Sequence, residues 1–261
     1  DELNTTQNTT IEFINYVGPH KVIDSLEAIK AIGTALGTVI SKDVTVASDA
    51  GNKAKYYVIH AVDPSENGKL DADILIIGKD ALVDHIRNMR HIIASYLSAA
   101  YGYTEQDAQT IATFVTVYNA VYRGDMETFN KKYKNAVTKN LTSENCGLSV
   151  NYKDWAGKSE IVIPLFDVKG GISTVDTSVI SDTKVVDSMQ EDDDKNIDSR
   201  KDMVDLKERE AEKATEKAQD SQKKATEEQK KLNEEKAKTE AAQKKADDSQ
   251  QKADEAKKEA L

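Results

Sequence analysis

Cysteine is almost absent from this chain of 261 residues, since Cys146 is the only one. A disulfide within the chain is therefore excluded, which fits either a reducing compartment or an exported bacterial protein that does not rely on disulfides. The sequence also lacks any run of about 18 apolar residues, so it predicts no transmembrane segment. Gly and Pro are missing from residues 200–261, so neither residue would interrupt a helix there.

Residues 200–261 predict one long helix, because Ala, Glu, Lys and Gln fill them and all four are strong helix formers. Small or apolar residues recur with a strict 3,4 spacing, which is typical of the seam of a left-handed coiled coil. The predicted interaction seam consists of Ala211, Ala214, Ala218, Ala225, Leu232, Ala242, Ala246, Ala253 and Ala256.

Two arrangements of this helical stalk stay open. Ala buries little area and Glu228 and Glu235 occupy two seam positions, so a homodimer through the stalk would be weak. Seven acid-before-base pairs four residues apart would together contribute about 1.5–3.5 kcal/mol to an isolated helix. The pairs Asp205/Arg209 and Asp220/Lys224 are two of them. The sequence therefore favours a single solvated helix and a weak dimer about equally.

The net charge of −10 is unevenly distributed along the chain. Residues 200–261 hold 17 basic and 17 acidic residues, so the excess of acid lies in the N-terminal part. An acidic head repels phosphates, and the lysines of the stalk alternate with carboxylates. We therefore expect no nucleic-acid partner.

Residues 11–180 are expected to form one α+β head, with a mixed or antiparallel sheet and packed helices. The order of the expected elements lacks the strict alternation of a doubly wound sheet. The expected strands are residues 11–17, 56–62, 74–77, 148–152, 160–165 and 172–175, and the expected helices are residues 24–41, 81–101, 105–122 and 125–137. Residues 1–10 form a loose tail, 181–199 an acidic hinge and 200–261 the stalk. Because the chain starts at Asp1 and stops without a capping signal, we expect a removed targeting segment and further sequence after residue 261.

Gly33 and Gly37 lie four residues apart on one face of the first expected helix. A phosphate-binding loop would need a preceding strand and a Lys-Ser or Lys-Thr pair after the second glycine, and both are missing. The spacing therefore predicts close packing of this helix face against another element.

The segment from Asp63 to Asp73 matches a calcium-binding loop only in part. Its candidate ligands are Asp63, Ser65, Asn67, Asp71 and Asp73. The bidentate Glu that closes an EF-hand site at the twelfth position is replaced by Ile74, and no helix is expected before the loop. A hairpin with Asn67-Gly68 at its tip is favoured, and no metal or other cofactor is predicted.

No catalytic residue is predicted. The chain has four histidines, His20, His60, His85 and His91, and nothing in their spacing requires a Ser-His-Asp arrangement. His85 and His91 lie six residues apart on an expected helix, so they cannot act as an i,i+4 metal pair.

Six stretches of the head carry a family resemblance. They are IEFINYVGP (11–19), LDADILIIG (70–78), IRNMRHIIASYL (86–97), TVYNAVYRGD (116–125), SENCGLS (143–149) and WAGKSEIVIPL (155–165). In these stretches the chain resembles the N-terminal domain of the spirochaetal 83/100 antigen family of Borrelia and Treponema. The resemblance implies an exported, immunogenic envelope protein of the periplasm or outer membrane, with a globular head followed by a charged helical segment. It implies no enzymatic activity, so no functional residues are carried over.

Two functions from different classes stay open. In the first, the protein is structural: the head docks on an envelope component and the stalk holds it away from the next domain. In the second, the head is a ligand-binding module or adhesin that recognises a host or envelope component. An exposed apolar or aromatic patch on the head would favour the second function.

Overall fold

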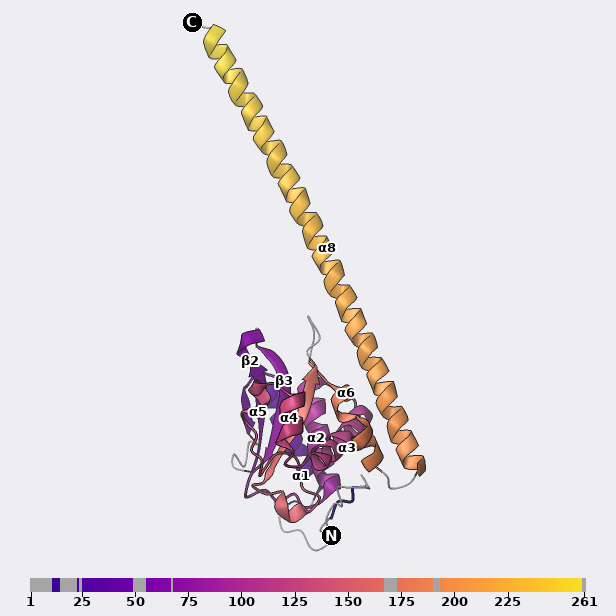
Figure 1. The fold of residues 1–261 in the computed structure, drawn as a ribbon. Coiled ribbons are helices and arrows are strands. Elements are labelled where there is room, and N and C mark those ends of the chain that lie inside the picture. Colours follow the sequence, from indigo (N-terminus) through magenta and orange to yellow (C-terminus); the bar gives the residue numbers. More distant parts are fainter. Residues whose placement is uncertain are drawn as a thin grey trace. The chain divides into compact units, whose positions relative to one another are not determined.

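A computed structural model describes residues 11–14, 23, 25–48, 55–66, 68–166, 173–189 and 193–259. The chain divides into two compact units, Asp1–Ala211 and Glu212–Leu261 (Figure 1). We call the first the head unit. The last helix, α8 (Asp193–Glu259), begins in the head unit, and we call its part from Glu212 onward the distal helix. The two units are described separately below.

The head unit is an α+β structure, as the sequence predicts. Its strands are β1 (Val46–Ser48), β2 (Tyr56–Asp63), β3 (Lys69–Ile77), β4 (Ser159–Phe166) and β5 (Thr174–Val175). Its helices are α1 (Leu26–Ile40), α2 (Ile86–Tyr101), α3 (Glu105–Val121), α4 (Met126–Lys132), α5 (Asn135–Thr138), α6 (Thr177–Ile180), α7 (Thr183–Ser188) and the first turns of α8, with short 3-10 helices at Pro64–Glu66 and Tyr152–Asp154.

The five strands form one sheet in the order β1-β2-β3-β4-β5, and every neighbouring pair is antiparallel. The expected β2–β3 hairpin is confirmed, and residues 64–68 connect its strands, beginning with the 3-10 helix Pro64–Glu66. Asn67, expected at the tip, lies outside the described residues. The expected strand 148–152 is not a strand, since this segment carries one isolated bridge, between Asn151 and Ile14, and runs into a 3-10 helix. The short edge strand β1 was missed because only three residues form it.

Both faces of the central strands are covered. Asp73 on β3 bonds to the hydroxyl group of Tyr96 on α2, so this face packs against the helical layer. Glu160 on β4 lies opposite Ile76, three residues beyond Asp73, and therefore points to the other face. There it accepts a 2.8 Å hydrogen bond from the Thr142 amide. The segment that follows α5 thus covers the second face, which explains why β4 is buried along nearly its whole length.

The glycine pair of α1 packs closely against α2, as the sequence predicts. A Cβ added at Gly33 would lie 2.1 Å from the Ile92 carbonyl oxygen, and one at Gly37 would lie 2.6 Å from the Tyr96 carbonyl oxygen. No side chain fits at such distances. These glycines therefore set the separation of the two helices.

Two expected helices have different bounds in the structure. Residues 81–85 are not helical, and His85 instead caps α2 by accepting a hydrogen bond from the Arg87 amide. The expected helix 125–137 is divided into α4 and α5, because Tyr133 adopts an extended backbone between them. Its ring stacks on Phe129 with the ring centroids 5.7 Å apart. Packing of this ring thus overrides the helical pattern.

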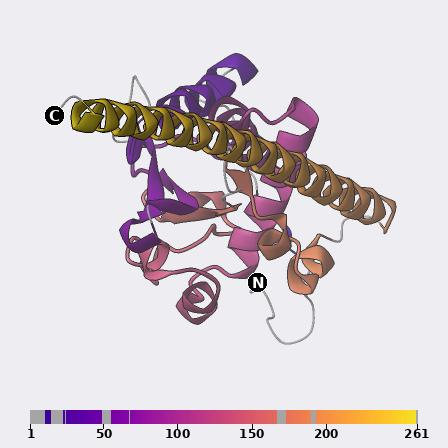
Figure 2. The ribbon, with the colours of Figure 1, turned by 90° about the horizontal axis from the view of Figure 1, so that it is seen from above.

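The acidic hinge expected at residues 181–199 differs most from the structure. Residues 183–188 form α7, and α8 already begins at residue 193. Val185 is fully buried, and Met203 and Leu206 on α8 are each 2% exposed within the core of the head unit. Mostly polar residues surround these three apolar residues in the sequence, so their burial was not expected. Figure 2 shows α6 and α7, in orange, together on one side of the head unit.

Candidate functional site: the anchorage of the long helix

Two aspartates define the short helices that precede α8. Asp176 caps α6 by accepting a hydrogen bond from the Ser178 amide, and Asp182 caps α7 by accepting one from the Val185 amide. Such caps satisfy backbone donors that have no partner inside the helix. Local sequence thus fixes where both helices begin, and packing against α3 holds them there.

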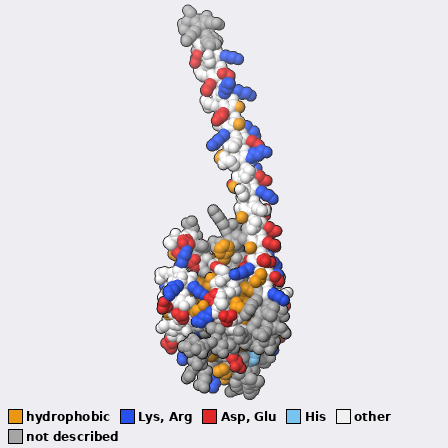
Figure 3. Space-filling model, turned by 45° about the vertical axis from the view of Figure 1, so that its right-hand side comes forward, with side chains coloured by type: hydrophobic (Ala, Val, Ile, Leu, Met, Phe, Trp, Pro, Cys, Tyr) orange, Lys and Arg blue, Asp and Glu red, His pale blue; other side chains and the backbone are white. Residues whose placement is uncertain are grey.

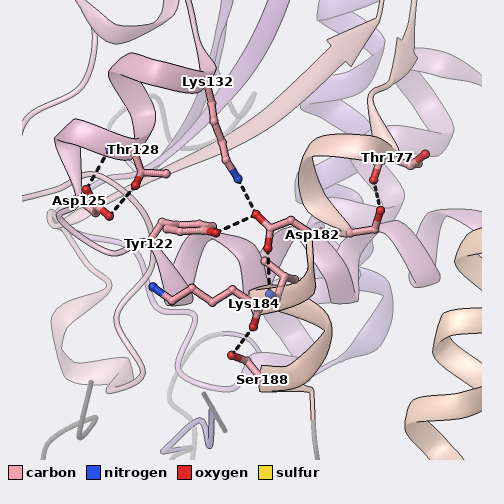
Figure 4. A network of polar contacts seen from close by, with 10 residues as sticks. Tyr122, Asp125, Thr128, Lys132, Thr177, Asp182, Lys184 and Ser188 are labelled. Atoms are coloured by element: carbon pink, nitrogen blue, oxygen red, sulfur yellow. Dashed lines mark hydrogen bonds and ion pairs between the residues drawn. The ribbon is translucent and has the colours of Figure 1, made fainter. Parts of the chain in front are cut away.

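Asp182 joins three helices (Figure 4). Its Oδ2 accepts a 2.8 Å hydrogen bond from the Tyr122 hydroxyl group, which follows α3, and pairs with the Lys132 ammonium group of α4 at 2.6 Å. Burial acts to raise the pKa of Asp182, but the bonds from Lys132, Tyr122 and the Val185 amide outweigh it and lower the pKa. The carboxylate is therefore ionised at neutral pH and holds α7 against α3 and α4.

Lysines on both sides of Tyr122 strengthen this cluster. The Lys132 ammonium group lies 4.4 Å from the Tyr122 ring centroid and 4.9 Å from that of Tyr118. Lys184 of α7 lies 4.9 Å from the Tyr122 centroid. At these distances a cation is attracted to the face of the ring, by about 0.5–1 kcal/mol where the site is exposed. The contact between Lys184 and Tyr122 is thus a second link between α7 and the end of α3.

The first turns of α8 are held by both polar and apolar contacts. Arg209 forms an ion pair with Asp107 in the first turn of α3. The Tyr103 hydroxyl group donates a 2.5 Å hydrogen bond to Glu210 and accepts one of 2.9 Å from the Val175 amide of β5. Burial raises the pKa of Tyr103, with Glu210 adding to the effect, so its hydroxyl group stays protonated as a donor.

We call this set of contacts the anchor: Tyr103, Asp107, Tyr122, Lys132, Asp182, Met203, Leu206, Arg209 and Glu210. Sequence reasoning placed Arg209 in the local pair Asp205/Arg209, and in the structure Arg209 pairs with Asp107. The partners are 102 and 107 residues apart in the chain, so spacing could not reveal them. The anchor fastens a helix; it places no nucleophile beside a base.

A second polar cluster lies between the sheet and α2. Asp73 is fully buried, and its carboxylate accepts hydrogen bonds from the hydroxyl groups of Tyr96 and Tyr101, the latter at 2.5 Å. The His60 Nδ1 lies 2.7 Å from its other oxygen. Burial and the Asp73 charge raise the pKa of both tyrosines. The cluster thus joins β2, β3 and α2, and we interpret it as structural.

The only thiol of the chain is a poor nucleophile at neutral pH. Cys146 is buried, and burial raises its pKa to about 12. Since the thiolate is the nucleophilic form, this cysteine is unsuited to catalysis at neutral pH.

Two of the candidate calcium ligands, Asp63 and Ser65, bond to each other, and Asp73 bonds elsewhere. Asp63 accepts hydrogen bonds from the Ser65 amide and hydroxyl group at 2.8 and 2.6 Å, which lower its pKa. Asp73 is engaged in the cluster with Tyr96 and Tyr101. Asp71 lies on β3, and Asn67 is outside the described residues. Within the described ranges no group of three His, Cys, Asp or Glu side chains is placed to hold a metal ion.

The predicted seam lies on the exposed part of α8. All of its described side chains are exposed, including Leu232 at 46%. Those of Ala214 and Ala256 lie outside the described set. Pairing through the seam stays a prediction, because it concerns two chains.

A groove of about 400 Å³ lies where α1, α2 and α3 meet. Its lining residues are Lys30, Thr34, Ala94, Ser95, Ser98, Ala99, Glu105 and Gln109. Lys30 and Glu105 form a 2.8 Å ion pair across it, and the Gln109 amide nitrogen lies 2.9 Å from the His91 Nδ1. Burial, aided by Lys30 and Arg87, lowers the pKa of His91, so its ring is neutral at neutral pH. The exposed lining of the groove is mostly apolar, with Lys30 and Glu105 as its charged side chains.

Comparisons with known proteins add one finding. The family model described as Borrelia P83/100 protein matches residues 1–261, the whole of this chain. No curated protein and no solved structure matches it. None of the described helices is long and apolar enough to cross a membrane.

Proposed function

The chain belongs to the Borrelia P83/100 protein family, an antigen family, and from this premise we propose that it is a non-enzymatic structural protein of the cell envelope. In this proposal the head unit docks on another envelope component, and α8 separates it from whatever follows. The protein acts after export, in the periplasm or at the outer membrane. Its partners are proteins of the envelope or the host.

The anchor is the observation that carries this proposal. A spacer can set a distance only if the end that meets the head is fixed, and a free hinge would defeat it. The first turns of α8 bury Met203 and Leu206 and form bonds through Arg209 and Glu210. From residue 212 to 259 the helix continues without interruption, over about 70 Å at 1.5 Å per residue.

A double variant, Met203→Ala with Leu206→Ala, tests the anchor. Each buried side chain removed costs about 2–3 kcal/mol, so residues 193–211 should lose protection from amide hydrogen exchange. The matched control is Val204→Ala in the same turn, because Val204 is 53% exposed. Unchanged protection in the double variant would mean that α8 is not held by these contacts, and the spacer proposal would fall.

The groove at α1, α2 and α3 favours the alternative, a ligand-binding module or adhesin. Replacing Thr34, which lines the groove, by Trp would fill it, whereas Thr38→Trp changes the same exposed face of α1 without lining the groove. The measurement is binding of the labelled chain to isolated envelopes. Loss of binding in Thr34→Trp alone would support the module. Equal binding of both variants would leave the structural proposal as the better one.

A further inference from the structure

The distal helix has two faces of opposite charge, although its overall charge is nearly balanced. We write its seven-residue repeat as abcdefg, with Ala218 at a and Ser221 at d. A coiled-coil partner touches only positions a, d, e and g, which we call the contact face. Between residues 214 and 253 the contact face carries seven lysines and two glutamates, whereas positions b, c and f carry three lysines and seven acidic residues. The contact face is therefore at +5 and the back face at −4.

The positive charge forms a stripe beside the seam. Position g is lysine in six successive repeats, and position e adds one more: Lys217, Lys224, Lys231, Lys238, Lys245, Lys252 and Lys236. From Lys224 onward all of these side chains are exposed. Lysine and acidic side chains are seen along the exposed helix in Figure 3.

Apart from Lys236, the opposite flank of the seam is uncharged between residues 214 and 253. Position e holds Gln222, Gln229, Gln243 and Gln250. The last three donate hydrogen bonds of 2.9–3.1 Å to Asn233, Asp247 and Asp254, which lie four residues ahead at position b. These bonds engage the glutamine amides with position b, and the glutamines supply no negative charge to the contact face.

A second copy of this chain does not complement such a face. In a parallel pair, position g of one helix meets position e of the other, so Lys231 would meet Lys236 and the other lysines up to Lys245 would meet glutamines. In an antiparallel pair, g meets g and lysine meets lysine. A parallel pair in register would also bring Glu228 and Glu235 against their own copies. Both pairings oppose two faces of +5, which is unfavourable.

From this charge pattern we propose that the distal helix binds an acidic amphipathic helix of another protein, which places large apolar side chains on the small seam residues and carboxylates opposite the lysine stripe. The proposal rests on the proposed function of α8 as a spacer that other envelope chains can reach. Charge complementarity of this kind selects the partner of a coiled coil.

Two further observations favour a helical partner over a flat anionic surface. Segments 218–225 and 246–253 share six of eight residues and lie four repeats apart, so the same face recurs at a spacing that a long helix of equal period can follow. The carboxylates of position c border the lysine stripe directly, as Asp220, Glu227 and Glu234 do. A flat anionic surface would meet these carboxylates, whereas a helix seated in the seam avoids them.

The test uses the full chain and two synthetic helices of six repeats. Both probes carry Leu at a and d; one has Glu at every e and g, and its twin has Lys there. In sedimentation velocity at low salt, the acidic probe should bind the chain about tenfold or more tightly than the basic one. Raising the salt to about 0.5 M should remove most of this difference, because exposed charges are then screened.

Charge reversal identifies the face. Lys224→Glu with Lys231→Glu and Lys238→Glu should abolish binding of the acidic probe and create binding of the basic one. The matched control, Lys223→Glu with Lys230→Glu and Lys244→Glu, makes the same change in net charge at position f of the back face and should keep the acidic probe bound. Circular dichroism checks that both variants stay helical, as expected since Lys and Glu are both strong helix formers.

Three results would overturn the proposal: equal binding of the two probes, equal loss in the two triple variants, or a chain that already sediments as a tight dimer without a probe. Stronger binding to vesicles of phosphatidylglycerol and phosphatidylcholine than to the acidic probe would assign the stripe to lipid instead. None of these results bears on the anchor, which hydrogen exchange at residues 193–211 tests separately.

Discussion

The head unit and the distal helix are built from different interactions. The head unit buries a continuous apolar core, including the only tryptophan, Trp155, and it brings together residues more than 100 positions apart, such as Tyr103 and Glu210. In the distal helix every described side chain except the half-buried Lys217 is exposed, and the hydrogen bonds that we identify among its side chains join residues four apart. One region depends on long-range packing and the other on local pairing. Substitutions of the same kind should therefore act differently in the two regions.

The largest effect is expected from truncating the chain at different residues after the head. The sequence alone predicts that residues 11–180 suffice, but Val185, Met203 and Leu206 are buried in the core. Losing them would cost about 5–9 kcal/mol, which approaches the whole stability of a typical domain. A chain ending at residue 211 should melt cooperatively by Trp155 fluorescence, and one ending at residue 180 should not. If the shorter chain melted cooperatively at the same temperature, the anchor would not contribute to the stability of the head.

The next largest effect is expected at Asp73. In Asp73→Asn the carboxylate that accepts bonds from Tyr96 and Tyr101 and lies beside His60 is lost inside the core. We expect a loss of about 3 kcal/mol in urea unfolding followed by Trp155 fluorescence. In the distal helix, Asp220→Asn should change far-ultraviolet circular dichroism only slightly. A neutral Asp73→Asn would show that the cluster contributes little to the head.

The two regions also differ in how far the sequence predicts them. The α+β class, the β2–β3 hairpin, the glycine contact and the long helix follow from local signals: Asn67-Gly68, Gly33 and Gly37, and the unbroken repeat. The anchor does not. Asp182 was expected in the acidic hinge and Met203 and Leu206 in the solvated stalk, and only tertiary packing shows that the last two are buried. Likewise Asp73 reads as a loop residue, and its bonds to Tyr96 and Tyr101 depend on the placement of α2 against the sheet.

A single methyl group should act with opposite signs in the two regions. Gly33→Ala raises helix propensity, but its Cβ would lie 2.1 Å from the Ile92 carbonyl oxygen, so we expect a net loss of about 1–3 kcal/mol in the head. At the exposed Ala237 the methyl group is removed instead. Ala237→Gly should destabilise the helix by about 1 kcal/mol and so lower its helicity. Urea unfolding measures the first change and circular dichroism the second. A stabilised Gly33→Ala would contradict the close contact of α1 and α2.

A dependence of stability on pH is expected at Asp182. Its pKa is lowered in the folded head, so its contribution is present above the pKa of the unfolded chain and is lost as the pH falls through the folded pKa. The head should therefore lose stability in acid, and Asp182→Asn should lose less over the same range. A matched change in the distal helix, Asp248→Asn, should leave the acid dependence of the Trp155 transition unchanged. If the parent and Asp182→Asn lost stability equally as the pH fell, the Asp182 carboxylate would not stabilise the anchor.

The smallest effect is that of salt on the distal helix. Its acid-before-base pairs are exposed, and each contributes about 0.2–0.5 kcal/mol, which salt of about 1 M screens. A peptide of residues 212–261 should therefore lose part of its helicity at 222 nm as salt rises, whereas burial protects the apolar core of the head, and the Trp155 transition should move little. Glu227→Gln with Glu234→Gln removes two of the pairs, those with Lys231 and Lys238. This variant should start at lower helicity and respond less to salt. If salt instead raised the helicity of the parent peptide, pairing between chains would outweigh the local pairs, and the distal helix would depend on long-range contact as the head does.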